Sequence, residues 1–226
     1  MQTWNNVLDY IKMNLGAPIQ SIELSDDDIV KYIKEHTLPL ISNYVPYTKY
    51  IVLNTDDFVD ESIGKYKLNT SDYIIDVLNL YSSINTGSMN VNMNKIIESL
   101  IANEIESIKQ YLSTTLDFRF EQPNYIILYD SYSTSYFPVL VEYNTVHQTL
   151  DTIPSDIYVN FFKPLALAEI KMLLGQARRK FQNVSTPFGP INTDGDNLYQ
   201  IGLQEREQLL QRLRDGIPPD KFIEFI

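Results

Sequence analysis

Few side chains in this sequence stand at spacings that support catalysis. The only two histidines, His36 and His147, are isolated, and neither belongs to a His-Glu-x-x-His metal pattern. Cysteine is absent, which excludes disulfides, thiolate metal sites and a cysteine nucleophile. The sequence also lacks the nucleophile-elbow, phosphate-loop and dinucleotide-binding glycine patterns. We therefore expect no catalytic residue, no cofactor and no enzymatic activity.

Two acidic stretches resemble metal sites, but each has a simpler interpretation. The three aspartates at 26–28 follow Ser25, as in a capped helix whose first turn favours negative charge. The loop 192–197 begins like a calcium loop. Its sixth position is Asn197, where glycine is required, and its twelfth is Leu203, where glutamate is required. We expect no bound metal at either stretch.

The densest group of cations predicts either a helix end or a contact surface. Three basic residues follow one another at 178–180, near the expected end of a helix, where they would stabilise its C-terminus. They could equally contact DNA or an acidic partner. The apolar tail at 221–226 either folds back on its own core or pairs with a sheet edge of another subunit. The candidate contacts with a partner or neighbouring subunit are Arg178, Arg179, Lys180, Arg206, Arg212, Phe222 and Phe225.

The charge distribution limits the partners of the chain. Its net charge is −11. Residues 1–163 hold 10 Lys or Arg and 21 Asp or Glu, whereas residues 164–226 hold 8 of each. A chain this acidic is repelled by nucleic-acid phosphates unless its basic groups are segregated. No apolar run is long enough to cross a membrane, and the N-terminus lacks the features of a signal peptide.

The sequence pattern predicts an α+β fold in three segments, whose helices and strands position these residues. Segment 1–45 is expected to be helical, with Pro39 ending or kinking a helix. Segment 46–150 is expected to be β-rich with one long helix at 93–112. Segment 151–226 is expected to form a helical hairpin and a tail, with a break or kink at Pro164. The predicted strands are 47–53, 65–68, 72–81, 117–121, 124–129 and 137–143.

The order of elements resembles that of a known protein family. A short helix ends at Gly16-Ala17-Pro18 and leads through an extended link to a capped acidic helix. Late in the chain, a helix ending in Lys180-Phe181 leads through a Pro/Gly-rich turn, closing at Gly195, to a charged helix. The stretches that carry the resemblance are 7–18, 22–29, 64–68, 75–78, 162–170, 175–181, 187–195 and 205–209. This layout resembles the neck, or head-to-tail connector, proteins of large contractile-tailed bacteriophages of the T-even type.

The sequence departs from the family pattern at two places. The turn at 187–190 reads Pro-Phe-Gly-Pro, where Pro-Gly-Gly is more typical, and Pro164 interrupts the start of a helix. Both departures bear on which member of the family the chain resembles more than on the class of protein.

The resemblance implies a structural role in a virus particle assembled in the host cytoplasm. Such proteins form homo-oligomeric rings beneath the portal, receive the tail and let DNA pass through the lumen without specific binding. The implied partners are other copies of the chain, the portal and adjacent neck or tail proteins, and the family implies no catalytic residues. The alternatives are a baseplate or tail-terminator component and a carboxylate-dependent metal enzyme such as a nuclease.

Overall fold

The computed structural model describes residues 2–17, 22–60, 64–82, 114–129, 139–180, 185–186, 189–190 and 194–216. The chain divides into two compact units. The helical unit comprises Met1–Val45 and His147–Ile226, and the β unit comprises Pro46–Val146. The β unit is thus inserted into the sequence of the helical unit. Helices and antiparallel sheets together confirm the predicted α+β class. The three-segment division stays a prediction, and the helix predicted at 93–112 lies outside the described residues.

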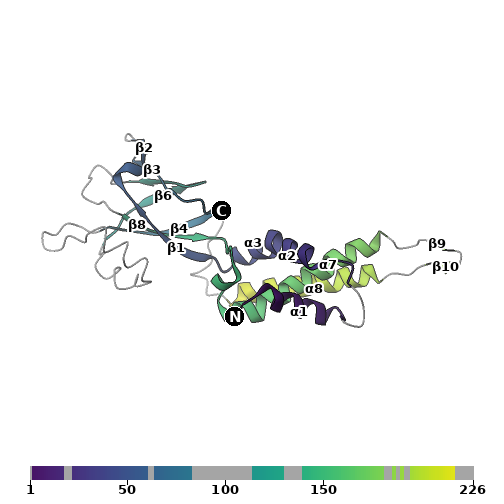
Figure 1. Cartoon of the computed structure of the whole chain (residues 1–226). Helices are drawn as coiled ribbons and strands as arrows, with labels where there is room; N and C mark the ends of the chain where they lie inside the picture. The colour runs from purple at the N-terminus through teal and green to yellow at the C-terminus, as the bar shows by residue number, and fades with distance from the viewer. Residues whose placement is uncertain are drawn as a thin grey trace. The chain divides into compact units, whose positions relative to one another are not determined.

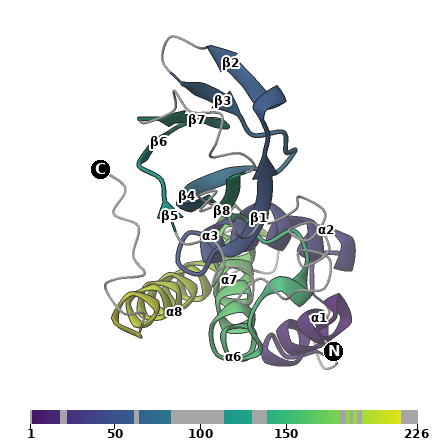
Figure 2. The ribbon, with the colours of Figure 1, turned by 90° about the vertical axis from the view of Figure 1, so that its left-hand side faces the viewer.

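The helical unit is organised around one central helix, α7 (Lys163–Arg179). In Figure 2, α7 lies between α8 (Gly195–Gly216) and α1 (Trp4–Asn14). Figure 1 shows α7 and α8 as an antiparallel hairpin, with the short strands β9 (Ser185–Thr186) and β10 (Gly189–Pro190) at its end. The remaining elements are α2 (Asp26–Tyr32), η1 (Ile33–Thr37), α3 (Leu38–Ser42), η5 (Leu150–Thr152), α6 (Ser155–Ile157) and η6 (Tyr158–Phe162). The predicted C-terminal helical hairpin is confirmed.

Burial explains why α7 is central. Its run from Leu165 to Ile170 is buried throughout, so the helix has neighbours on several sides. Ala166 and Ala168 are fully buried there, and their small side chains allow close packing. The core also draws apolar residues from both ends of the chain, as in the hydrophobic stripe of α1. Core members include Val7, Ile11, Ile29, Ile33, Ile41, Phe162, Leu165, Ile170, Leu174, Leu209 and Leu213.

Neither Pro39 nor Pro164 ends the helical path, so of the two expectations at Pro39 the helix end is wrong, whereas a kink there, like the one expected at Pro164, stays a prediction. Each proline is the second residue of an α-helix that follows a five-residue π-helical turn, η1 before Pro39 and η6 before Pro164. A proline lacks the N–H that an α-helix would use, and its ring crowds the carbonyl four residues earlier. The wider π turn shifts the hydrogen-bond register at that point, so the helical path continues.

The described residues of the β unit form two four-stranded antiparallel sheets. Sheet A has the order β1-β8-β4-β5, and sheet B has the order β2-β3-β7-β6. Their strands are β1 (Tyr47–Leu53), β2 (Phe58–Asp60), β3 (Lys65–Lys67), β4 (Ile74–Ser82), β5 (Thr114–Thr115), β6 (Phe118–Glu121), β7 (Tyr125–Leu128) and β8 (Val139–Thr145). All six predicted strands are confirmed with small shifts of their ends. The acidic stretch after Asn54 contains β2 and a 3-10 turn at Thr55–Asp57.

One apolar cluster joins the two sheets of the β unit. Leu53, Leu80 and Val141 come from sheet A, and Tyr66 and Ile126 come from sheet B. Alternate residues along each strand enter this cluster, as expected for sheets that face each other across a core. The residues between them therefore lie on the outer faces of the sheets.

The two ends of the helical unit that flank the inserted β unit are bonded to each other through His147. The buried His147 places Nε2 2.7 Å from the carbonyl oxygen of Val45 and Nδ1 2.7 Å from Oγ1 of Thr152. Its backbone N–H donates to Ser42 Oγ at 3.0 Å, and Ser42 donates in turn to Leu38. A carbonyl oxygen only accepts, so Nε2 carries a proton. Burial lowers the pKa of His147, which favours its neutral form.

Candidate functional site

Direct backbone contact between α7 and α8 positions the predicted basic cluster. A Cβ atom on Gly175 would lie 2.6 Å from the backbone nitrogen of Tyr199, and one on Gly202 would lie 2.7 Å from the carbonyl oxygen of Ala168. Only glycine fits at such distances. The hairpin therefore holds the last turn of α7 firmly against the first turn of α8, and this last turn carries the cations at 178–180.

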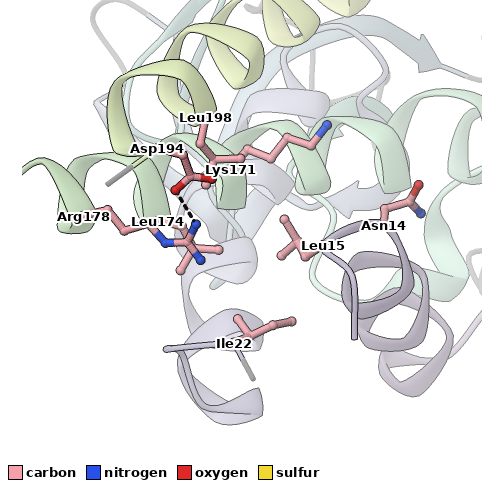
Figure 3. A pocket seen from close by; sticks show the side chains of 8 residues that line it. All are labelled: Asn14, Leu15, Ile22, Lys171, Leu174, Arg178, Asp194 and Leu198. Atoms are coloured by element: carbon pink, nitrogen blue, oxygen red, sulfur yellow. Dashed lines mark hydrogen bonds and ion pairs between the residues drawn. The ribbon is translucent and has the colours of Figure 1, made fainter. Parts of the chain in front are cut away.

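Arg178 joins three segments of the helical unit. Its Nε and Nη2 donate to the two carboxylate oxygens of Glu23, at 2.9 and 3.1 Å, in a bidentate pair. Its Nη1 donates to Oδ1 of Asp194 at 2.8 Å, as Figure 3 shows. Asp194 directly precedes α8 and accepts the N–H of Leu198 through its carbonyl oxygen. The hydrogen bonds from Arg178 lower the pKa of Glu23, so this pair is ionised at neutral pH.

The next two basic residues differ in how far they are bonded within the chain. Arg179 donates through Nε to Oδ1 of Asp196, and its guanidinium lies 4.3 Å from the ring centre of Tyr199. Lys180 follows the last residue of α7 and is exposed. Among the described residues it has no bonded carboxylate. The helix-end interpretation of this cluster therefore agrees with the bonds of Arg178 and Arg179, while a partner contact by any of the three stays a prediction.

A small pocket of about 140 Å³ lies beside this cluster (Figure 3). Its lining residues are Asn14, Leu15, Ile22, Lys171, Leu174, Arg178, Asp194 and Leu198. The two cations of the pocket are already bonded, because Lys171 Nζ lies 2.6 and 2.7 Å from the carboxylate oxygens of Glu205. The arrangement stabilises the junction of three segments. It presents no unbonded cation to a ligand.

Sequence reasoning missed the buried Glu169 of α7. Its Oε2 accepts a hydrogen bond from Thr37 Oγ1 at 2.5 Å, and its Oε1 lies 3.4 Å from Nε of Arg206. Arg206 therefore faces inward on one side of α8. Arg212, also predicted as a contact, is exposed, with its guanidinium 5.6 Å from the ring centre of Phe161. The apolar positions around Glu169 on α7 were the available signal for its burial.

A second buried glutamate, Glu142, lies on the central strand β8 of the β unit. Its Oε1 accepts from Tyr50 at 2.7 Å, and its Oε2 accepts from Asn79 and Tyr81 at 2.8 Å each. Neutral donors on both neighbouring strands thus solvate the carboxylate inside the sheet. Because side chains alternate along a strand, Glu142 lies on the side of β8 that faces away from the core. This position could have been predicted from the sequence. Its three partners depend on the register between strands.

The other predicted site residues have structural roles or lie outside the described ranges. Ser25 accepts the N–H of Asp28, which confirms the predicted helix cap. Asp194 and Asp196 of the calcium-like loop bind the arginines of α7, whereas Asn192 is not described. Phe222 and Phe225 are likewise outside the described residues.

Within the described residues, no three His, Asp or Glu side chains gather as metal ligands would. None of the helices there has the length and apolar character needed to cross a bilayer.

These features define an α+β protein in which a β unit is inserted into a helical bundle, and in which most basic residues of the hairpin hold segments of the bundle together. Residues 1–219 match the family described as bacteriophage ring protein, and the chain belongs to this family. It is a ring-type structural protein of a bacteriophage particle. No curated protein matches the chain.

Proposed function

We propose that this protein forms a homo-oligomeric ring in the neck of a tailed bacteriophage, between the portal and the tail. The match of nearly the whole chain to the bacteriophage ring proteins carries this proposal. The late sequence pattern, which resembles that of neck proteins, points to the same position in the particle. The protein acts through contacts with its own copies and with the portal or tail, and no catalytic step is part of this function.

The charge of the chain suits a ring through which DNA passes. The net charge of −11 makes the average surface repulsive to DNA phosphates. A ring built from such subunits lets DNA move through its lumen without adhering to it. Adhesion would require a continuous series of phosphate contacts from basic residues, and its strength would fall steeply with salt concentration.

The rigid hairpin suits a docking role. The close contact of α7 and α8 and the bonds of Arg178 hold this part of the helical unit in one shape. A surface that is preorganised in this way loses little conformational entropy when a partner binds. The portal or the tail would therefore meet a defined surface.

The first test is the mass of the purified protein by native mass spectrometry, alone and mixed with purified portal rings or tails of the same phage. We expect a closed oligomer, or a monomer that joins the portal ring. A monomer that ignores both and binds a divalent metal would overturn the proposal and favour the metal-enzyme alternative.

A phage that lacks the gene separates the neck from other positions in the particle. Loss of a neck ring should leave DNA-filled heads and complete tails that do not join. Defective tails with normal heads would instead place the protein in the baseplate or at the tail terminus. Restoring the wild-type chain from a plasmid is the control.

A further inference from the structure

One edge of the β unit differs from the other edges of its described sheets. Sheets A and B have four terminal strands, and three of them are short, because β5 has two residues, β2 three and β6 four. The pairing of β2 is also interrupted by a shift in register. The fourth terminal strand, β1, lies at the side of sheet A opposite β5 (Figure 2). It has seven residues and pairs with β8 in an unbroken register. Short strands and bulges protect an edge from pairing with another chain, and β1 has neither.

The residues of β1 also favour pairing. The strand contains no proline, and its only charged residue, Lys49, is bonded to Asp72 at 2.8 Å. Proline and unpaired lysine are the residues that commonly protect an edge strand. Five of the other six residues are tyrosine, threonine, isoleucine or valine, which favour strands. Every second residue of a terminal strand directs its backbone N–H and C=O away from the sheet, so β1 presents a regular series of hydrogen-bonding groups.

Burial shows that the core of the β unit is incompletely covered along β1. All seven residues of the neighbouring strand β8 are buried, whereas six of the seven in β1 are only partly buried. Ile51 is one of these six, although it packs against the apolar cluster that joins the two sheets. A further strand beside β1 would remove this apolar surface from water.

The sequence after α8 offers a segment of matching composition and length. Residues 221–226, which lie outside the described residues, read Lys-Phe-Ile-Glu-Phe-Ile. Four of these six residues are phenylalanine or isoleucine, which favour strands. Pro218 and Pro219 precede them, and prolines favour an extended backbone. The six strands predicted from the sequence already belong to sheets A and B, which leaves this run as the candidate for a further strand.

The length of the tail allows contact with a neighbouring copy. Ten residues, 217–226, follow the end of α8 at Gly216. An extended chain of this length spans about 30 Å, which is the diameter of a small domain. Pairing of β1 with β1 of a second copy would join identical patches and close after two copies. A contact between the tail and β1 joins two different patches, as a ring requires.

We propose that residues 221–226 of one copy pair as an added strand with the outer edge of β1 in the next copy of the ring. The contact rests on the proposed ring function. Backbone hydrogen bonds hold the tail along β1, and its phenylalanine and isoleucine side chains pack beside the tyrosine, isoleucine and valine of that strand. Each copy gives one tail and receives one, so the same contact repeats around the ring.

Engineered disulfides test where the tail binds, because the chain has no cysteine of its own. Glu224→Cys is combined with Thr48→Cys and, separately, with Val52→Cys, two positions on one face of β1. After oxidation of the assembled protein, alone or on portal rings, non-reducing electrophoresis should show ladders of covalently linked copies. Glu224→Cys combined with Arg119→Cys, at an exposed position of β6, is the matched control and should remain monomeric on the gel.

Proline substitution separates strand pairing from general apolar adhesion. Consecutive residues of a strand direct their N–H groups to opposite sides, so only one of Ile223→Pro and Glu224→Pro removes a bond to β1. That variant should weaken association between copies about tenfold relative to alanine at the same position, and the other variant much less. A chain that ends at Asp220 should lose at least as much. Native mass spectrometry measures association, and circular dichroism verifies that each variant is folded.

Several outcomes would overturn this contact and leave the proposed function intact. Equal effects of the two prolines would contradict strand pairing, as would unchanged rings of the chain that ends at Asp220. A disulfide within one copy, or between Thr48→Cys residues of two copies, would contradict the proposed occupant. A shortened chain that forms rings but no longer joins the portal would assign the tail to the portal. A wild-type chain that never associates with itself or with the portal would overturn the proposed function and this contact together.

Discussion

Among the described residues, each of the two units buries one glutamate, and the two carboxylates have different kinds of partner. Glu169 of the helical unit is 6% exposed and meets the hydroxyl of Thr37 and the cationic Arg206. Glu142 of the β unit is 7% exposed and receives hydrogen bonds from two tyrosines and an asparagine. In the helical unit a cation neutralises the buried charge. In the β unit, neutral donors on neighbouring strands solvate it.

The same contrast holds for the cations. The dense basic cluster of the helical unit is largely bonded inside that unit, as the pairs of Arg178 and Arg179 show. The β unit has fewer cations, yet Lys67 and Arg119 are exposed and form no ion pair within 4 Å among the described residues. Cation density along the sequence is therefore a poor guide to which described cations are free of ion pairs. Side-chain alternation along strands determines which face such a residue occupies.

The largest expected effect comes from separating α7 and α8. Gly175→Val would place side-chain atoms where backbone atoms of Tyr199 and Gly195 lie within 2.6–2.8 Å of the Cβ position. We expect a loss of about 4 kcal/mol in unfolding free energy. Denaturant unfolding followed by the fluorescence of Trp4, the only tryptophan and part of α1, reports the helical unit. Gly216→Ala is the matched control, since no atom of the described residues lies within 4 Å of its Cβ position, and it should shift the midpoint very little.

Substitution of the two buried glutamates should give the next largest loss of unfolding free energy. It tests directly how differently the two carboxylates are held. Glu142→Leu leaves three donors without this acceptor inside the sheet, and we expect it to cost about 3 kcal/mol. Glu169→Leu should cost about 1–2 kcal/mol, because Arg206 is partly exposed and can turn to solvent. Hydrogen exchange along β8 and α7 measures the two separately. Equal losses of unfolding free energy in the two variants would contradict this expectation. They would show that the donors around Glu142 depend on their carboxylate no more than Arg206 depends on Glu169.

Arg178→Met should have a smaller effect, about 1 kcal/mol, although it removes three hydrogen bonds. Glu23 and Asp194 are more than half exposed, so water replaces the lost guanidinium. Lys180→Met, two positions away and without a bonded carboxylate among the described residues, should leave the midpoint unchanged. If both substitutions cost the same, the ion pairs of Arg178 do not stabilise the junction. Trp4 fluorescence again provides the measurement.

The smallest expected effect is a pH dependence of the helical unit that arises from His147. The folded-state pKa of His147 lies below its ordinary value of 6.5, because burial opposes the charged form. The unfolded chain therefore binds a proton more readily, and stability falls as the pH decreases below about 6.5, down to the lower folded pKa. The ring nitrogens meet the uncharged hydroxyl of Thr152 and carbonyl of Val45. His147→Asn should flatten this part of the profile, whereas His36→Asn at the exposed histidine should preserve it.

The sequence predicted the elements better than the interactions that hold them. Alternation and turn residues located β1, β4 and β8, and apolar periodicity located α1, α7 and α8, because these signals are local. The sequence leaves open whether Pro39 ends or kinks its helix, because the π turn that accommodates the proline has no comparable sequence signal. The partners of Arg178 lie 155 and 16 positions away. Such pairings follow from tertiary packing, which a single sequence does not specify.

The insertion of the β unit determines when each unit can fold during translation. All strands of the β unit have left the ribosome soon after Thr145 is added, so this unit can fold while the rest of the chain is still being made. The helical core requires Ile11 and Ile33 from the start of the chain together with Ile170 and Leu213 from near its end. The first helices must therefore keep an apolar stripe exposed until α8 emerges. A truncated product of stalled synthesis would carry a complete β unit on an unfolded, aggregation-prone N-terminal segment.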